Sequence, residues 1–376
     1  MPAAGDVAAL LAVVPRWIVA GIEAQGADGI EEIEMDLGRV PRLHRCGRRE
    51  PVVLAREVGP EDLQYVLGRV TRFREDNRTG IERTLHRIAC IRDRYHEIVG
   101  FTFRVGRTIA GAAEPLRDLL EAGRSLLVVG RPGAGKTTLL RSAAAILSEQ
   151  LHRRVIIADT SNEIGGDGQI PHPAIGGARR LQIPLPESGR SSEAGDRQAG
   201  AILQAVINHR ADTIIVDELG FASDARVART IARRGVQLIA TAHGTSLRDV
   251  IFNSELACLV GDLHPIVLSP EEIERRGIAR HTILERTGPP VFDCAVEIAR
   301  RDTLLIHPDV AASVDDLLSG LAPRTVVRRH GQAAADGHQD PTPVTPNTSS
   351  GTGEAQDPAD PSGAGDSHGA GRRQMV

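Results

Sequence analysis

The stretch GRPGAGKTT, at residues 130–138, restricts the possible folds more than any other part of the chain. It fits the pattern G-x-x-x-x-G-K-[ST] and lies between an apolar run, SLLVV, and a helical pattern, as a phosphate-binding P-loop requires. Glycines let such a loop curl so that several N–H groups face inward, and the start of the helix adds partial positive charge. We therefore expect the following residues to enclose the phosphates of ATP: Gly130, Arg131, Pro132, Gly133, Ala134, Gly135, Lys136, Thr137 and Thr138.

The P-loop contains the only lysine of the chain. The 45 basic residues are Lys136 and 44 arginines. A lysine is a compact charge on a slim, flexible stem that can reach β- and γ-phosphate oxygens, whereas the rigid fork of an arginine would crowd the loop. We interpret Lys136 as the position where geometry forbids arginine, the alternative being a chance match to the motif.

The run TIIVDE, residues 213–218, predicts a strand that carries two acids to its carboxyl end. A carboxylate there can hold Mg²⁺ together with a P-loop hydroxyl, so we expect Asp217 and Thr137 to be the metal-binding residues. The next residue, Glu218, is then placed to orient and polarise water for attack on the γ-phosphate. Because strands often end in acids, the pattern gains its weight from lying about 80 residues after the P-loop with another strand between.

The following strand, VQLIATAHG, ends in polar residues that we expect at the same edge of the sheet. Thr241 or His243 would emerge there, within reach of the γ-phosphate. A polar side chain in this place can sense whether that phosphate is present, although a single histidine is often structural.

The loop that follows RVIIAD, residues 159–180, allows two interpretations. It is either a glycine-rich surface connection or the source of a further catalytic acid, Glu163 or Asp159. On the second interpretation, Arg179 and Arg180 meet a phosphate in a neighbouring subunit, where an arginine stabilises the charge of the transition state.

Strands and helices alternate from residue 125 onward. The order is strand 125–129, helix 136–150, strand 154–159, helix 198–209, strand 213–218, helix 222–233 and strand 236–244. Short apolar runs bounded by helices predict a parallel sheet covered by helices on both faces. The predicted fold class is α/β, with a doubly wound sheet.

Changes in pattern divide the chain into four parts. The expected parts are a small N-terminal α+β domain, 1–115; a P-loop ATPase core with a C-terminal extension, 116–308; a short helical or linker segment, 309–330; and a disordered tail, 331–376. The first contains a helical pattern from Pro60 and a β-hairpin over residues 88–106. The tail has almost no large apolar residues to offset its ordering entropy, and its six acids and two arginines together account for the whole formal net charge of −4.

Composition argues against several classes of protein. The four cysteines lie far apart without metal-ligand spacing, so neither a zinc site nor a disulfide framework is expected. The most apolar N-terminal run is interrupted by Pro15 and Arg16, so we expect no export signal, no membrane span and a cytoplasmic location. Aromatic residues make up only 2% of the chain, which disfavours a base-stacking platform for single strands.

Four blocks of the sequence point to a family. GRPGAGKTTLLR, VIIADTSNEIGGDGQIPHPAIGGARR, TIIVDELG and GVQLIATAHG closely resemble the ATPases of the stage III sporulation protein AA group and its plastid and cyanobacterial relatives. Flanking blocks at 75–94 and 274–298 are similar too, so the resemblance covers about residues 55–308. It implies a RecA/AAA-like ATPase of the additional-strand, catalytic-glutamate type, related to the motors of type II secretion and type IV pili.

The resemblance also implies an N-terminal domain that covers the nucleotide and a ring of six subunits. Glu163 falls in the acidic box of those motors and His243 in their histidine box. Many relatives carry a C-terminal module for single-stranded nucleic acid, recognised by an arginine and a histidine separated by three residues. Residues 309–376 show no such module, which makes nucleic acid a less expected partner.

Three functions remain open at this point. The first is an ATP-hydrolysing oligomeric motor or remodeller that uses Glu218 to activate water. The second is a single-strand nucleic-acid-binding protein whose affinity is switched by nucleotide. The third is a nucleotide-binding scaffold of a secretion or envelope complex, whose slow turnover would be raised by an unidentified protein partner.

Overall fold

A computed structural model describes residues 4–183, 191–276, 281–300 and 302–329. Residues 4–107, which we call the N-terminal domain, contain a six-stranded antiparallel sheet in the order β3-β2-β1-β6-β5-β4. The strands are β1 (Ile30–Asp36), β2 (Arg42–Arg45), β3 (Val52–Val53), β4 (Arg78–Gly80), β5 (Arg87–Arg92) and β6 (Ile98–Arg104). Three helices contribute to the core of this sheet: α1 (Ala4–Leu11), α2 (Arg16–Ala24) and α3 (Pro60–Leu67).

The hairpin expected in this domain is confirmed by the pairing of β5 with β6. Phe101 and Phe103 of β6 are fully buried on either side of the less buried Thr102, and they lie opposite Cys90 and Ile88 of β5. The N-terminal apolar run forms two helices because Pro15 cannot continue the first one and instead sits at the N-cap of the second.

The P-loop core, from residue 108 onward, contains an eight-stranded sheet in the order β16-β15-β14-β7-β11-β10-β8-β9. The strands are β7 (Leu126–Gly130), β8 (Val155–Asp159), β9 (Arg179–Gln182), β10 (Thr213–Leu219), β11 (Gln237–Ala242), β14 (Cys294–Arg300), β15 (Thr303–His307) and β16 (Val326–Arg329). The six strands from β14 to β9 run parallel, which confirms the predicted α/β class.

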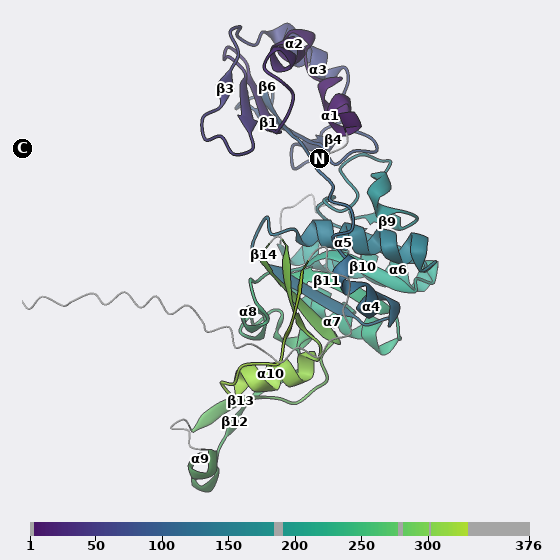
Figure 1. Cartoon of the computed structure of the whole chain (residues 1–376), viewed down its shortest axis with the longest axis vertical. Coiled ribbons are helices and arrows are strands. Elements are labelled where there is room, and N and C mark those ends of the chain that lie inside the picture. The colour runs from purple at the N-terminus through teal and green to yellow at the C-terminus, as the bar shows by residue number, and fades with distance from the viewer. Residues whose placement is uncertain (1–3, 184–190, 277–280, 301, 330–376) are drawn as a thin grey trace, which may run out of the picture. The chain divides into compact units, whose positions relative to one another are not determined.

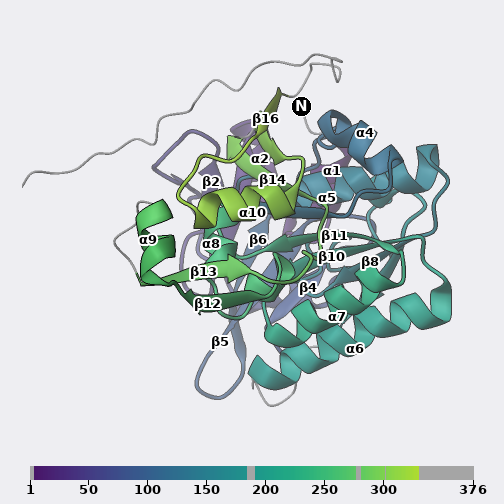
Figure 2. The same cartoon turned by 90° about the horizontal axis from the view of Figure 1, so that it is seen from below.

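Helices cover both faces of this sheet (Figures 1 and 2). Leu126 and Val128 of β7 pack with α4 (Arg117–Glu121) and α5 (Lys136–Ala145), which continues as one π-helical turn to Gln150. Leu127 and Val129 lie in the opposite core, which is formed with α6 (Ser191–His209), α7 (Ala222–Arg233), α8 (Leu247–Ile251) and α10 (Val310–Leu318). The strand is therefore apolar throughout because both of its faces are buried.

Strand β11 lies between β7, which precedes the P-loop, and β10, which ends in the two acids. This is the additional strand of the predicted fold type. Because parallel strands end at a common edge, the P-loop, the residues after β8, the acids of β10 and the residues after β11 all meet there.

The C-terminal part differs from the expectation of a helical or linker segment at residues 309–330. This segment contains α10 and also β16, which pairs antiparallel with β15 at the edge of the main sheet. Val326 and Val327 are largely exposed between arginines, so a two-valine strand gives little sequence signal. A separate hairpin, β12 (Leu263–Val267) and β13 (Thr282–Arg286), carries α9 (Pro270–Arg276). The expected tail, 331–376, lies outside the described residues.

None of the described helices is both long and apolar enough to cross a bilayer.

The start of α7 carries a buried carboxylate that should make stability depend on pH. Asp224 accepts the N–H groups of Gly220 and Phe221 at 3.1 Å, and burial raises its pKa to about 6. A pKa raised by folding gives stability that is fully present below the unfolded pKa and is lost as pH rises through about 6.

We therefore expect the stability of Asp224→Asn relative to wild type to increase by about 1–2 kcal/mol as the pH rises from 5 to 8. The amide oxygen of the variant can still accept both N–H groups, and the variant buries no charge at the higher pH. Thermal unfolding of both proteins at the two pH values measures this change. A difference in melting temperature that is the same at both pH values would contradict the assignment.

Candidate active site

The P-loop connects β7 to α5. Gly133 and Gly135 have φ angles of 73° and 110°, a left-handed backbone that disfavours any residue with a side chain. A Cβ atom at either position would meet nothing within 4 Å, so these glycines are needed for the curl of the loop and not for packing. The first N–H groups of α5 have no acceptor inside the helix and are available to an anion.

Two bonds hold the loop in place. The Nζ of Lys136 donates to the carbonyl of Gly130 at 2.8 Å, so the lysine side chain folds back over the loop toward the end of β7. The N–H of Gly130 donates to the carbonyl of Gly244 at 3.0 Å. The P-loop is thereby tied to the segment that follows β11 and carries His243.

Asp217 is buried at the carboxyl end of β10. The hydroxyl of Ser161 donates to its carboxylate. Burial and the nearby carboxylates of Asp159, Glu163 and Glu218 raise the pKa of Asp217 to about 7. Four acids therefore gather at one place, where a cation would stabilise their ionised forms.

Glu218 lies beside His243, with the Oε1 and Nε2 atoms 3.0 Å apart. Both side chains are accessible, at 43% and 75% exposure. Thr241 is buried instead, and its hydroxyl donates to the main-chain carbonyl of Asp217. Of the two residues expected at the end of β11, the structure therefore leaves only His243 able to meet a ligand.

The two candidate acids of the loop after β8 also differ in exposure, since one is buried and the other is accessible. Asp159 is fully buried and accepts the N–H groups of Ile164 and Gly165 at 3.2 and 2.8 Å, so it shapes its own loop. Burial raises its pKa. Glu163 is half-exposed, and its Oε2 accepts a long hydrogen bond of 3.5 Å from the hydroxyl of Thr137. Glu163 is thus the acid of this loop that faces the P-loop.

Arg141 supports the loop from the other side. Its guanidinium is buried on α5 and donates to the carbonyls of Ile164 at 2.7 Å and Glu163 at 2.6 Å. Burial lowers its pKa to about 10, against the attraction of Asp159, Asp217 and Glu163. It remains a cation at neutral pH and offsets part of the negative charge of the four acids.

The N-terminal domain grips the same loop through Asp167. This carboxylate is 2% exposed and accepts Arg74 at 2.7 Å and the Nε of Arg87 at 3.1 Å. Arg87 also pairs with Glu163 at 3.3 Å. In addition, the carboxylate of Glu82 accepts the N–H groups of residues 169 and 170.

The glycines of the GGDG segment, residues 165–168, permit this contact. A Cβ at Gly166 would lie 2.2 Å from the carbonyl oxygen of Thr84, and one at Gly168 would lie 2.9 Å from the Cα of Glu82. Main chain therefore packs directly on main chain. The segment expected as a possible free surface connection is a close contact between the two domains.

A hollow of about 230 Å³ lies between the P-loop helix and the N-terminal domain. Thr137 and Thr138 line it from α5, while Arg87, Arg104 and Arg107 line it from the N-terminal domain. A site at the P-loop would therefore be bordered by arginines of the N-terminal domain, and the acids Glu163 and Asp167 also line the hollow.

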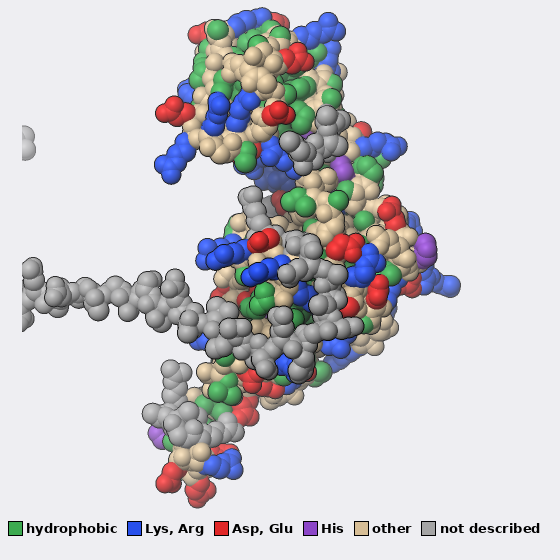
Figure 3. All heavy atoms as spheres, viewed as in Figure 1, with side chains coloured by type: hydrophobic (Ala, Val, Ile, Leu, Met, Phe, Trp, Pro, Cys, Tyr) green, Lys and Arg blue, Asp and Glu red, His purple; other side chains and the backbone are tan. Residues whose placement is uncertain are grey.

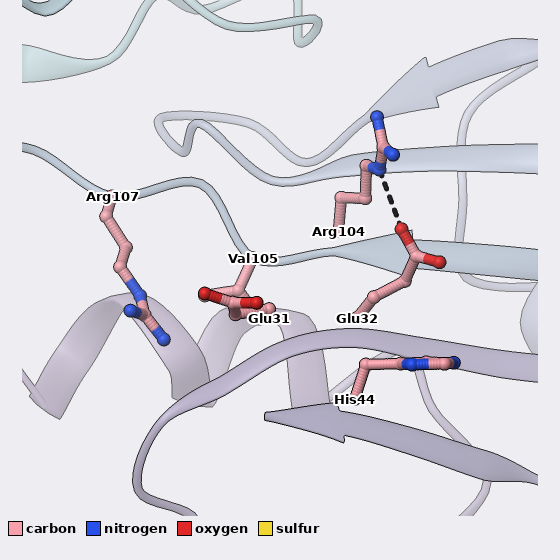
Figure 4. A pocket seen from close by; sticks show the side chains of 6 residues that line it. All are labelled: Glu31, Glu32, His44, Arg104, Val105 and Arg107. Carbon is pink, nitrogen blue, oxygen red and sulfur yellow. Dashed lines mark hydrogen bonds and ion pairs between the residues drawn. The ribbon is translucent and has the colours of Figure 1, made fainter. Parts of the chain in front are cut away.

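Two of these three arginines are engaged within their own domain. Arg104 pairs with Glu32 at 2.7 Å, and Arg107 donates to the carbonyl of Ile30 at 2.7 Å. Figure 4 shows both in a second hollow of about 490 Å³, where Arg104 points to Glu32 above His44. Arg87 is the arginine of this group that contacts the acidic side chains of the P-loop core.

Four residues that contact the site are not among those expected from the sequence: Arg87, Arg141, Ser161 and Gln198. Arg141 could have been found, because it lies four residues after Thr137 and so on the same face of α5. Arg87 and Gln198 lie outside the P-loop and the run TIIVDE, and no local pattern distinguishes them from other arginines and glutamines.

Similar proteins were found by sequence. The ycf45 protein of Cyanidium caldarium is 35% identical over 324 residues, which cover 86% of this chain and 93% of that protein. The chain belongs to the ycf45 family. Stage III sporulation protein AA of Bacillus subtilis is 27% identical over 247 residues, covering 59% of this chain and 76% of that protein, which confirms the resemblance stated above. No protein-family model matches the chain.

Two of the similar proteins are longer than this chain. Protein SEEDLING PLASTID DEVELOPMENT 1 of Arabidopsis thaliana is 44% identical over 299 residues, 80% of this chain. This chain spans 42% of its length and 55% of the ycf45 protein of Porphyra purpurea. Among solved structures, the ATPase DotB of Legionella pneumophila matches 76% of both chains with a TM-score of 0.45 and 14% identity. The strand order described above, and not this likeness, defines the fold.

In this ycf45-family chain, the two arginines that begin β9 differ in their surroundings. Arg180 donates to the carbonyls of Gly166, Gly168 and Gln169, and so holds the glycine-rich segment of its own subunit. Arg179 is exposed and forms no ion pair with a described residue. Of the two candidates for contact with another subunit, Arg179 is the one whose charge is not already engaged.

The Asp167 contact leads to a prediction for stability. Asp167→Asn should lower the stability of the protein by roughly 1–3 kcal/mol, because it leaves two partly buried guanidinium groups without their carboxylate. Thermal unfolding measures the loss, and hydrogen exchange of residues 160–182 should become faster. The matched control is Asp76→Asn, since Asp76 also pairs with Arg74, at 3.2 Å, but is more exposed. Equal effects of the two changes would contradict the role assigned to Asp167.

Proposed function

We propose that this chain binds ATP with Mg²⁺ and hydrolyses it, as an AAA-like motor or remodeller that works as a homo-oligomer. The observation that carries the proposal is the meeting of the P-loop with the buried Asp217 and its neighbour Glu218 at one edge of the sheet. A P-loop and a carboxylate on separate parts of the sheet would not support it.

The residues of the site suit both ligands. The N–H groups of the P-loop and the Nζ of Lys136 would hold the phosphates, while Thr137 and Asp217 would hold Mg²⁺, which needs few protein ligands. The pKa of Asp217, raised by burial and by nearby acids, fits a place completed by a cation, because a divalent ion favours the ionised carboxylate. When bound, Mg²⁺ neutralises charge on the β- and γ-phosphate oxygens.

The proposed chemistry assigns a role to each acid. Glu218 orients the attacking water and accepts its proton. His243, beside Glu218, responds to the γ-phosphate. Glu163 lies between Thr137 of the P-loop and Arg87 of the N-terminal domain, so it would adjust both contacts when nucleotide arrives.

The assembly we propose is a homo-oligomer, a ring of six by resemblance to the secretion motors. Arg179 is exposed and would supply positive charge to a phosphate bound by the neighbouring subunit. Nucleic acid is the less favoured partner. On the face shown in Figure 3, basic and acidic side chains lie next to one another and do not form a basic stripe.

Phosphate release by the purified chain tests the proposal directly. We expect turnover with ATP and Mg²⁺ and none when EDTA removes the metal, with sedimentation showing an oligomer in the presence of ATP. Binding of ATP without phosphate release would instead favour the scaffold function. Turnover or ATP binding that depends on added single strands, and weakens steeply with salt, would favour the nucleic-acid-binding function.

A further inference from the structure

Gln198 of α6 joins the loop after β8 to the end of β10 in the candidate site. Its side chain is 3% exposed, and both ends of its amide are used. The Oε1 accepts the hydroxyl of Thr160 at 2.9 Å, and the Nε2 donates to the main-chain carbonyl of Glu218 at 2.5 Å. Thr160 belongs to the loop that carries Glu163, so the amide bridges the segments that hold the two acids.

The hydrogen bond from Gln198 to the carbonyl of Glu218 takes the place of a ladder bond between strands. The pairing of β10 with β8 ends at Val216, and the register between β10 and β11 shifts between Val216 and Leu219. Asp217 and Glu218 therefore lie where the regular ladder is interrupted. Their carbonyls are held by side chains instead, that of Asp217 by Thr241 and that of Glu218 by Gln198.

Only an amide of this length performs both tasks. A glutamate could accept from Thr160 but could not donate to a carbonyl, and a leucine could do neither. Because the group is buried, a lost partner would not be replaced freely by water, and the backbone of Glu218 would be left to shift. Small displacements of a catalytic group lower the rate more than they lower binding.

We propose that Gln198 is a positioning residue for Glu218, which fixes its main chain and ties it to the loop of Glu163. The inference rests on the proposed hydrolysis of ATP. It concerns the geometry of the reaction and not the binding of nucleotide, because Gln198 contacts the segment after β8 and the end of β10 and is not in the P-loop.

The test compares Gln198→Leu and Gln198→Glu with wild type, measuring phosphate release, the Kd of a fluorescent ATP analogue with Mg²⁺, and thermal unfolding. We expect kcat to fall at least tenfold in both variants while the Kd stays within threefold of wild type. The matched control is Gln204→Leu, the same change at an exposed position of the same helix. It should leave kcat and Kd unchanged.

Changes at Thr160 provide the second arm. Thr160→Val removes the hydroxyl that donates to the amide of Gln198 and should lower kcat severalfold. Thr160→Ser keeps this hydroxyl and should have a kcat close to that of wild type. If the Gln198 variants do not fold, this pair decides the question. Equal kcat in Thr160→Val and Thr160→Ser would then overturn the inference.

The outcomes separate this inference from the proposed function. Wild-type kcat in the folded Gln198 variants, or equal losses of kcat and ATP affinity, would overturn the positioning role while leaving ATP hydrolysis in place. A wild-type protein that binds ATP but releases no phosphate would overturn both.

Discussion

Replacing Glu218 by glutamine should leave ATP binding intact and reduce its hydrolysis by about a hundredfold or more, the range of general acid–base effects. Glutamine has nearly the same shape as glutamate but cannot accept a proton from water. The side chain of Glu218 is accessible beside His243, and its carbonyl is held by Gln198, so the substitution should not disturb the backbone. Phosphate release and the Kd of a fluorescent ATP analogue measure the two quantities separately.

The control for this experiment is Glu271→Gln, which makes the same change at an exposed glutamate in the first turn of α9. It should hydrolyse ATP at the wild-type rate. A Glu218→Gln protein with wild-type turnover would rule out Glu218 as the residue that activates water, and Glu163 would then be the acid to examine next.

Lys136→Arg should fail even though it preserves the positive charge. We expect ATP affinity to fall at least tenfold, about 1.4 kcal/mol or more, and turnover to become undetectable, because the planar guanidinium cannot follow the path that the lysine takes along the loop. The Nζ of Lys136 lies 2.8 Å from the carbonyl of Gly130, inside a loop whose curl depends on left-handed glycines. Titration with the fluorescent ATP analogue measures the loss.

The opposite exchange outside the site, Arg233→Lys at the exposed end of α7, should change neither affinity nor turnover. Lys136→Arg protein that binds and hydrolyses ATP normally would show that charge alone is required at this position. The presence of a single lysine among 44 arginines would then have no explanation in the geometry of the loop.

The parts of the fold that follow from local pattern were predictable. The four central strands are apolar runs, because both faces of the sheet are buried under helices. The helix α7 shows the spacing of apolar residues that is typical of a helix with one buried face. The meeting of the P-loop, Asp217 and His243 followed from one rule, that parallel strands end at a common edge. Strands β14, β15 and β16 were not predicted, because their position in the sheet depends on pairings between segments distant in the sequence.

The supporting residues of the site could not be read from the sequence for the same reason. Whether Thr241 or His243 faces the ligand, and whether Asp159 or Glu163 does, depends on which side chain turns into the protein. Asp167 and Arg87 act through a contact between domains, and although both lie in blocks that resemble the family, nothing in those blocks indicates that the two residues meet. Sequence motifs mark the groups proposed to touch nucleotide, whereas the groups that hold them are set by tertiary packing.

The contact between the GGDG segment and the N-terminal domain has a consequence for how such proteins can diverge. Main chain meets main chain there, and the carboxylate of Asp167 serves two arginines from the other domain. A recombination event that exchanged about the first hundred residues for an unrelated module would leave that carboxylate buried without its arginines. It would also replace the main chain that packs against the glycines. We therefore expect the coding regions of the N-terminal domain and the P-loop core to be inherited together.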